Sequence, residues 1–228
     1  MIILALDALD KNMVERFNCK NLMQLEYGET DISNFKLERT VALWASFLTG
    51  KNMENKIPIK GQWEFKLKES ETLFNFFNSY KAIDVPAFSF KKNHGLERKL
   101  LKDYFKDECD VEEYDKVVWK HHEENKNVFL ENLNNFKCLM CYFNLADAIG
   151  HLSFGVLDKM KMVYNELDAI AKIARKGNRF ILIISDHGMK AVGRFGDHSK
   201  YGFYSCNQKL NLKKPKITDF FNLIKRMR

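Results

Sequence analysis

Three continuous apolar runs stand out along this chain of 228 residues. They cover residues 2–6, 136–143 and 180–184, and polar side chains follow each run within a few residues. A strand that is buried on both faces of a parallel sheet has this unbroken apolar character, whereas a strand with one wet face alternates. The three runs therefore predict buried strands of a parallel sheet.

An amphipathic helix is predicted between the second and third runs. Gly177-Asn178 follows its last apolar position and favours the end of a helix. The apolar positions recur at steps of three and four: Val156, Met160, Val163, Leu167, Ile170 and Ala174. Strand, helix and strand at this spacing are typical of a parallel crossover. The pattern predicts an α/β fold with a doubly wound, mostly parallel sheet flanked by helices.

The segment from about residue 52 to residue 130 is less regular and more charged. We expect it to combine sheet-edge elements with a small insertion that packs over one end of the sheet. The length of the chain and the absence of linkers or repeats predict a single domain over residues 1–228, with a reduced cap within this segment. Near the C-terminus, a terminal helix is expected with an apolar stripe of Ile217, Phe220, Phe221 and Ile224.

The chain has 37 Lys and Arg residues against 30 Asp and Glu residues, a net charge of +7. From Asn207 onward, seven basic residues stand against Asp219 alone, so this segment can attract nucleic acid. A solvated terminal helix is the favoured interpretation, because no aromatic residues interleave with the basic ones after Phe221. The odd number of five cysteines argues against a disulfide framework and favours a reducing cytoplasm. No apolar run reaches membrane-spanning length, and no signal-peptide pattern is present.

Aspartates and histidines gather just after the predicted strands. Asp147 and His151 are four residues apart, so one helical turn would aim both side chains at one point. Asp186-His187-Gly188 follows the third run, Asp7 ends the first, and His198 lies in a predicted loop. Because ligands bind outside the carboxyl ends of the strands in open α/β sheets, these residues predict a metal site at that edge.

Two other pairs of potential metal ligands are predicted not to bind a metal. Cys138 and Cys141 have zinc-knuckle spacing, but they lie inside an apolar run and are predicted to be buried strand cysteines. His121 and His122 stand among charged residues and are predicted to be solvated. No phosphate-binding glycine loop is present.

The segment from Arg39 to Gly50 completes a set of motifs that resembles the alkaline phosphatase superfamily, in its type I phosphodiesterase and nucleotide pyrophosphatase branch. Members carry a strand-terminal Asp, a nucleophilic Thr or Ser ahead of a Thr-Gly pair, Asp-x-x-x-His, Asp-His-Gly and a final Gly-x-His. This chain has them in that order: Asp7, Thr40 ahead of Thr49-Gly50, Asp147 with His151, Asp186 with His187, and His198. The resemblance implies an alkaline-phosphatase-like α/β sandwich.

The resemblance also implies a phosphoester hydrolase with two divalent metal ions. One ion would be held by Asp7, Thr40, Asp186 and His187, and the other by Asp147, His151 and His198. Such mixed imidazole and carboxylate ligands suit zinc, with manganese or iron also compatible. Thr40 would be the catalytic nucleophile, forming a covalent phosphothreonine that an activated water then hydrolyses.

The chain departs from the family pattern after the Thr-Gly pair. It lacks the phosphate-binding asparagine that nucleotide pyrophosphatases would place near Lys60 to Gln62. Candidate substrate-binding cations are Lys51, Lys60 and Arg194. We expect a small-molecule phosphoester or nucleotide substrate with a phosphodiester or pyrophosphate bond. Two alternatives stay open: a phosphomonoesterase or phosphomutase on the same core, and a metal-stabilised nucleic-acid-binding module.

Overall fold

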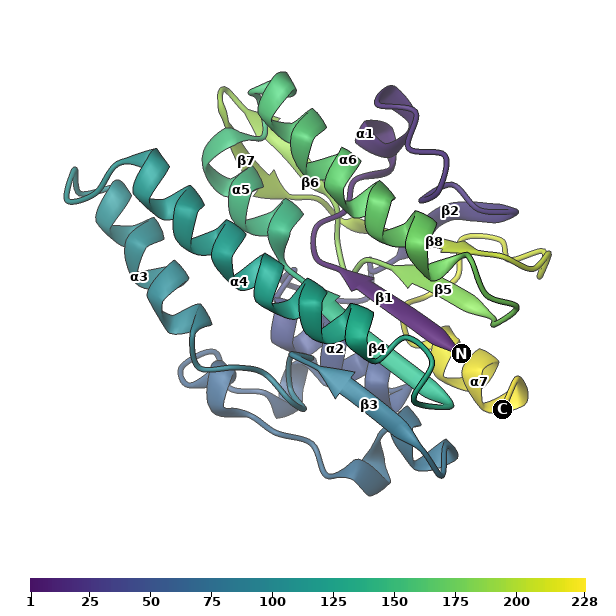
Figure 1. Cartoon of the computed structure of the whole chain (residues 1–228). Helices are drawn as coiled ribbons and strands as arrows, with labels where there is room; N and C mark the ends of the chain where they lie inside the picture. The colour runs from purple at the N-terminus through teal and green to yellow at the C-terminus, as the bar shows by residue number, and fades with distance from the viewer.

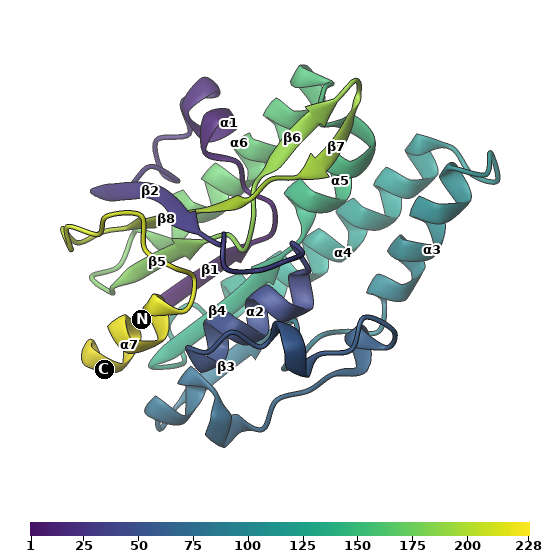
Figure 2. The ribbon, with the colours of Figure 1, turned by 180° about the vertical axis from the view of Figure 1, so that it is seen from behind.

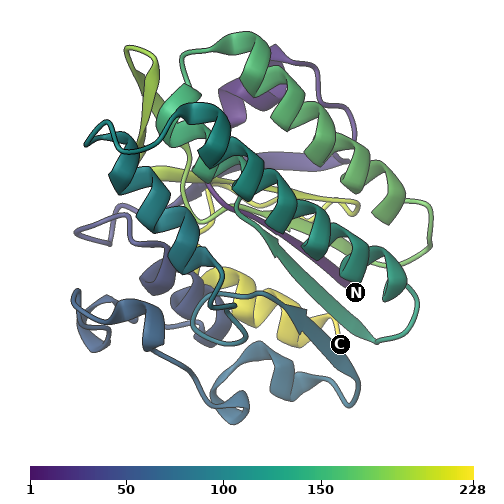
Figure 3. The ribbon, with the colours of Figure 1, turned by 60° about the vertical axis from the view of Figure 1, so that its left-hand side comes forward.

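A six-stranded sheet lies between two layers of helices in the computed structural model, which describes residues 1–228 (Figures 1 and 3). The strand order is β2-β8-β5-β1-β4-β3, and β8 alone runs antiparallel to its neighbours. The mostly parallel sheet predicted from the sequence is therefore confirmed. The strands are β1 (Ile2–Leu6), β2 (Glu26–Asp31), β3 (Tyr80–Ile83), β4 (Cys138–Phe143), β5 (Ile181–Ile184) and β8 (Tyr201–Cys206).

The three apolar runs form the centre of this sheet. β1 pairs in parallel with β4 on one side and with β5 on the other. Every residue of these three strands is buried, because helices cover both faces. The unbroken apolar pattern thus has the cause expected for a doubly wound sheet. Cys138 and Cys141 are buried free thiols within β4, as predicted.

Helices α1, α4, α5 and α6 pack on one face of the sheet, and α2 and α7 pack on the other (Figures 1 and 2). The predicted amphipathic helix is α6, although Val156 precedes it and is exposed. No helix combines the length and the hydrophobicity needed to cross a lipid bilayer. The helices are α1 (Lys11–Arg16), α2 (Thr40–Thr49), α3 (His94–Tyr104), α4 (Val111–Glu131), α5 (Leu145–Ser153), α6 (Leu157–Ala174) and α7 (Asp219–Arg226).

The irregular segment from 52 to 130 holds three kinds of structure. Its first part makes four short 3₁₀ turns, its middle supplies the edge strand β3, and its last part forms α3 and α4. α4 packs directly on the sheet face, and α3 packs on α4. The 3₁₀ turns cover Glu54–Lys56, Gln62–Glu64, Glu69–Glu71 and Leu73–Phe76.

A two-stranded hairpin of β6 (Met189–Val192) and β7 (Phe195–His198) packs against α5. The prediction that His198 lies in a loop is wrong, since it is the last residue of β7. Gly196 permits this packing, because a Cβ atom there would lie 2.7 Å from the carbonyl oxygen of Gly150. The close approach of hairpin and helix carries His198 toward His151.

The C-terminal segment forms the expected terminal helix. Ile217, Phe220 and Ile224 are buried against the sheet face that α2 also covers, whereas Phe221 is half-buried. Beyond them, the charged ends of Lys225 and Arg228 lie 5.8 and 5.9 Å from the ring centroid of Phe76. The apolar stripe therefore accounts for the helix, and the last basic residues lie at its end.

Candidate metal centre

The candidate ligands come from loops and elements at the carboxyl ends of the parallel strands. Asp7 directly follows β1, and Asp186 and His187 follow β5 after one intervening serine. Asp147 and His151 lie one turn apart on α5, the helix that begins two residues after β4. Parallel neighbours end at the same edge of a sheet, so the fold gathers these side chains as the sequence predicts.

Asp7, Asp186 and His187 form one group of ligand atoms. The Nε2 atom of His187 lies 3.3 Å from Oδ1 of Asp7 and 3.6 Å from Oδ2 of Asp186. All three residues are buried almost completely. One ligand atom from each lies within 4.8 Å of the other two, so a single cation between them can be reached by all three.

Asp147, His187 and His198 form a second group within the same limit of 4.8 Å. The Nε2 atoms of His151 and His198 lie 3.4 and 3.3 Å from Oδ1 of Asp147. The rings of His187 and His198 stack with their centroids 3.9 Å apart. The two groups therefore adjoin at His187, which the family resemblance assigns to the first group only.

Two of the histidines have their ring orientation fixed by the backbone. Nδ1 of His187 lies 3.0 Å from the carbonyl oxygen of Gly188, and Nδ1 of His198 lies 3.0 Å from that of Glu38. A carbonyl only accepts, so each Nδ1 carries the proton in these bonds. Nε2 is then free to offer a lone pair to a metal ion, which is the usual arrangement of metal-binding histidines.

Several buried polar atoms of this centre have no hydrogen-bond partner. They are Oδ1 of Asp7, Oδ1 of Asp147, both carboxylate oxygens of Asp186 and Nε2 of His187. A buried polar group without a partner costs about 1–3 kcal/mol, and more when it is charged. Oxygen and imidazole donors that converge without protein partners are suited to divalent cations, so the residues present fit two ions.

The shifted pKa values of the buried side chains are also consistent with bound cations. Burial, and then the charge of Asp147, raise the pKa of Asp7 to about 7. Burial and the neighbouring Asp7 also raise the pKa of Asp186 well above its usual value. Burial and the charge of His198 lower the pKa of His187 to about 3, which keeps this ring neutral. Asp147 differs, because the neighbouring His151 and His198 lower its pKa. Without cations, the site thus opposes the ionised forms of Asp7 and Asp186 that metal binding requires.

Thr40, the candidate nucleophile, is the first residue of α2. It is 8% exposed and lines a cavity of about 490 Å³ together with Asp7, Asp147, His151 and His198. Arg39, which precedes the helix, makes no side-chain cap. The first backbone N–H groups of α2 are therefore free of a capping side chain and suited to an anion.

The three cations proposed from the sequence do not line this cavity. Lys51 lines a separate pocket of about 350 Å³ near Phe221, and Lys60 and Arg194 are exposed elsewhere on the surface. The cations on the cavity wall are instead Arg39, Arg98 and Lys102. The guanidinium of Arg39 donates to the carbonyl oxygens of Ile57 and Glu54 at 3.1 and 2.9 Å. These cations lie in segments without a recognisable motif, so the sequence does not predict that they line the cavity.

Two further residues beside the centre are not predicted from the sequence. The hydroxyl of Tyr142 donates to Oδ2 of Asp7, the oxygen opposite the one that faces His187. Tyr142 lies within an apolar run, where its burial is expected but its polar contact is not. Asn144 lines the cavity at the start of α5. Its position directly after β4 was the only available signal.

The prediction that His121 and His122 are solvated is wrong. Both are buried on α4, with 8% and 1% of their surface exposed. Nδ1 of His121 lies 2.6 Å from Oε1 of Glu97 on α3, and Nε2 of His122 lies 3.2 Å from Oε1 of Glu166 on α6. Their partners are distant in the sequence, so the charged residues beside them gave a misleading signal.

Comparison with known proteins supports the fold. No protein-family model matches the sequence, and no characterised protein matches it significantly by sequence. Alkaline phosphatase from the Antarctic bacterium TAB5 is similar in structure, with a TM-score of 0.56, 12% identity, and coverage of 99% of this chain and 96% of that one. A variant of the same phosphatase, with Mg bound in its M3 site, gives the same values.

Murine ectonucleotide pyrophosphatase/phosphodiesterase 5 matches more weakly, with a TM-score of 0.48 and 11% identity. That match covers 85% of this chain and 58% of the murine one. The TAB5 enzyme instead matches along almost its whole length, so the likeness takes in the mostly parallel sheet and the flanking helices of this chain. The chain therefore has the alkaline phosphatase fold.

Proposed function

We propose that this protein is a metal-dependent phosphoester hydrolase with Thr40 as its nucleophile. The observation that carries the proposal is the convergence of buried ligand atoms without hydrogen-bond partners, from Asp7, Asp147, Asp186 and His187. Thr40, at a helix N-terminus, lines the same cavity as Asp7 and Asp147. A protein that only stabilised its fold would gain nothing from burying these donors unpaired. The alkaline phosphatase fold is consistent with this chemistry.

Seven residues would hold two divalent ions in this proposal, with zinc as the first choice. One ion would be bound by Asp7, Asp186, His187 and the hydroxyl of Thr40, and the other by Asp147, His151 and His198. Two ions bound there would supply positive charge that lowers the pKa of the threonine hydroxyl and stabilises the oxygens of the reacting phosphoryl group.

The protein's own groups then perform a two-step displacement. Oγ of Thr40 attacks phosphorus, the bond from phosphorus to the leaving oxygen breaks, and a phosphothreonine forms. The N–H groups at the start of α2 bind the equatorial phosphoryl oxygens. Water then attacks the phosphothreonine from the side vacated by the leaving group, which releases phosphate or phosphomonoester and restores the hydroxyl. Tyr142 holds the Asp7 carboxylate in place through both steps.

A phosphodiester or pyrophosphate bond suits the cavity better than a monoester. Its volume of about 490 Å³ leaves room for a second substituent, and residues 62–102 build the wall that this substituent would meet. We therefore propose one domain with a reduced cap that lies within the segment from about 52 to 130. The guanidinium of Arg39, next to Thr40, is already engaged by backbone carbonyls, whereas a dianionic monoester requires additional positive charge.

Hydrolysis of two chromogenic substrates tests this proposal. Metal-free protein is reconstituted with zinc or manganese, and kcat/KM is measured for bis-p-nitrophenyl phosphate and for p-nitrophenyl phosphate. The diester should be the better substrate, and Thr40→Ala should hydrolyse neither. Preference for the monoester would instead favour a phosphomonoesterase or phosphomutase, and turnover that survives Thr40→Ala would exclude the covalent mechanism.

A nucleic-acid-binding module makes a different prediction. It requires salt-dependent binding of a polyanion that survives loss of Thr40 and depends on the basic residues after Asn207. The charged ends of Lys225 and Arg228 gather beside Phe76, and α7 is otherwise packed on the sheet.

All five cysteines are free thiols, as expected in a reducing compartment, so we propose a cytoplasmic location.

A further inference from the structure

One wall of the cavity, which carries none of the candidate metal ligands, is built by α3 and the segment before it. Gln62 and Trp63 come from a 3₁₀ turn, Phe90 from the loop before α3, and Arg98 from α3 itself. Trp63 and Phe90 have nearly parallel rings with centroids 5.6 Å apart. This wall combines flat apolar surfaces with a cation, which is a common composition for a ligand-binding surface.

Arg98 is held in place but has no anionic partner. Its guanidinium carbon lies 4.2 Å from the ring centroid of Trp63, and the side chain is half-buried. No hydrogen bond or ion pair of the structure engages it. Burial lowers its pKa, and the negative charges of Glu97 and Glu64 act in the opposite direction. A guanidinium stacked on an indole keeps its N–H groups in its own plane, where they can meet a planar or tetrahedral oxyanion.

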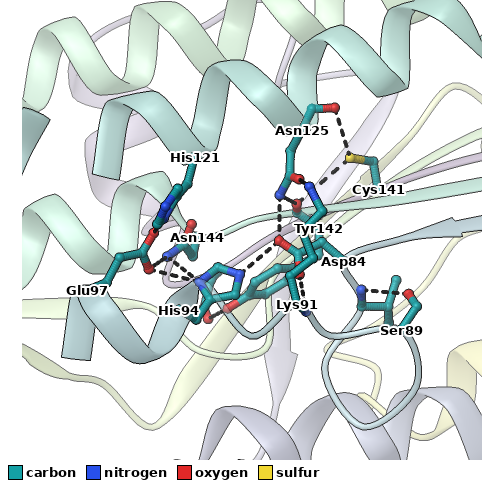
Figure 4. A network of polar contacts seen from close by, with 12 residues as sticks. Asp84, Ser89, Lys91, His94, Glu97, His121, Asn125, Cys141, Tyr142 and Asn144 are labelled. Carbon is teal, nitrogen blue, oxygen red and sulfur yellow. Dashed lines mark hydrogen bonds and ion pairs between the residues drawn. The ribbon is translucent and has the colours of Figure 1, made fainter. Parts of the chain in front are cut away.

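The carboxylate next to Arg98 in the sequence is already occupied (Figure 4). Oε1 of Glu97 lies 2.6 Å from Nδ1 of His121, and Oε2 lies 2.8 Å from Nδ1 of His94 and 2.7 Å from Nδ2 of Asn144. Glu97 therefore has no oxygen left for Arg98. The other buried carboxylate nearby, Asp84, is likewise bound by His94 at 2.8 Å.

The charge of His94 is also neutralised within this network. Burial alone would lower its pKa, but hydrogen bonds and attraction from Asp84 and Glu97 raise it to about 9. Both ring nitrogens face carboxylates, so neither is available to a ligand in the cavity. Both terminal nitrogens of Arg39 are engaged as well, by two carbonyl oxygens, which leaves only its Nε without a partner. Arg98 is consequently the half-buried cation of this cavity whose whole guanidinium is free to bind an anion.

We propose that Arg98 is a second anion subsite, which binds a phosphate group that the substrate carries apart from the phosphoester at the metal centre. This inference rests on the proposed function and names the substrate class: phosphoesters whose second substituent bears its own phosphate. The scissile group lies at Thr40, and the distal phosphate forms a bidentate pair with the guanidinium. Trp63 supports the guanidinium from one face.

Binding of paired ligands tests the subsite without turnover. Zinc-loaded Thr40→Ala protein is titrated by calorimetry with alkanediol bisphosphates of increasing chain length, each compared with its monophosphate. At the chain length that spans the cavity, the bisphosphate should bind about tenfold or more tightly than the monophosphate, as a charge-assisted bond predicts. Adding Arg98→Gln should remove this preference, and Arg98→Lys should retain only part of it.

Lys99→Gln is the matched control. Lys99 is the next residue on α3, is exposed, and pairs with Asp103 at 2.6 Å outside the cavity lining. Lys99→Gln should keep the preference for the bisphosphate, although it changes the net charge by the same amount as Arg98→Gln. The subsite is disproved if Arg98-intact protein binds both ligands alike, or if Arg98→Gln weakens both to the same extent. If zinc-loaded protein binds neither ligand, the proposed function fails, and the subsite fails with it.

Discussion

Replacing Asp7 by asparagine should stabilise the metal-free protein and prevent it from binding a full set of ions. The carboxylate is 1% exposed, and its Oδ1 has no hydrogen-bond donor. That oxygen lies 3.3 Å from Nε2 of His187, whose lone pair faces it because Nδ1–H donates to Gly188. An asparagine amide is neutral, can still accept from Tyr142, and brings an N–H group toward His187.

The magnitude follows from the raised pKa of Asp7. A change from 3.8 to about 7 corresponds to about 4 kcal/mol between the two protonation states. The unfolded chain loses this proton near pH 3.8 and the folded chain near pH 7, so wild-type stability falls relative to the variant as pH rises across this window. Below it the difference should vanish. Above it the variant should melt roughly 8–16 °C higher, at 2–4 °C per kcal/mol.

Urea denaturation in the presence of a chelator, repeated from pH 4 to pH 8, measures this difference. Zinc should then stabilise the wild type strongly and Asp7→Asn weakly, because one carboxylate ligand is lost. Asp197→Asn removes an exposed carboxylate of β7 and should change stability by no more than about 0.5 kcal/mol. If Asp7→Asn is less stable than wild type at pH 8 without metal, the carboxylate is satisfied by the protein alone, and the argument for a metal centre fails.

Three further predictions concern the centre and the tail. Thr40→Ala should abolish diester turnover and keep a metal content near that of wild type by elemental analysis, whereas Thr40→Ser should retain measurable kcat because the hydroxyl survives. Reconstituted protein should hold two ions per chain, with one lost in Asp147→Ala and the other in Asp186→Ala; a single ion in wild type would contradict the two-ion site. Deleting residues 225–228 should leave kcat for bis-p-nitrophenyl phosphate nearly unchanged, since no proposed ligand lies there, and a large loss without a lower melting temperature would contradict this placement.

The sheet could be predicted from the sequence because its pattern has one physical cause. A parallel strand covered by helices on both faces must be apolar at every position, so residues 2–6 and 180–184 leave little choice of structure. The candidate ligands could also be located, because each follows a strand or lies on the helix after one. Asp147 and His151 show this most clearly, since a helical turn relates them in sequence and in space.

The cavity wall could not be predicted for the opposite reason. Its residues come from 3₁₀ turns and a loop, which have no hydrophobic period, so nothing in the sequence relates Trp63 to Arg98. The sequence predicts a loop at His198 because the four-residue strands of the hairpin are too short to show a recognisable hydrophobic pattern. The burial of His121 depends on Glu97, a residue 24 positions away on another helix.

Helix α4 explains why the buried histidines matter to the cavity as well as to the fold. Adjacent residues on a helix point about 100° apart, so His121 reaches Glu97 on α3 while His122 reaches Glu166 on α6. The contact of His121 with Glu97 therefore holds α3 against α4, and the contact of His122 with Glu166 holds α4 against α6. Because Arg98 follows Glu97 on α3, the bond that fixes Glu97 also fixes where this guanidinium stands relative to the metal centre. The position of the proposed anion subsite thus depends on the buried contact of Glu97, which lines the cavity, with His121, a residue that the sequence pattern predicts to be solvated.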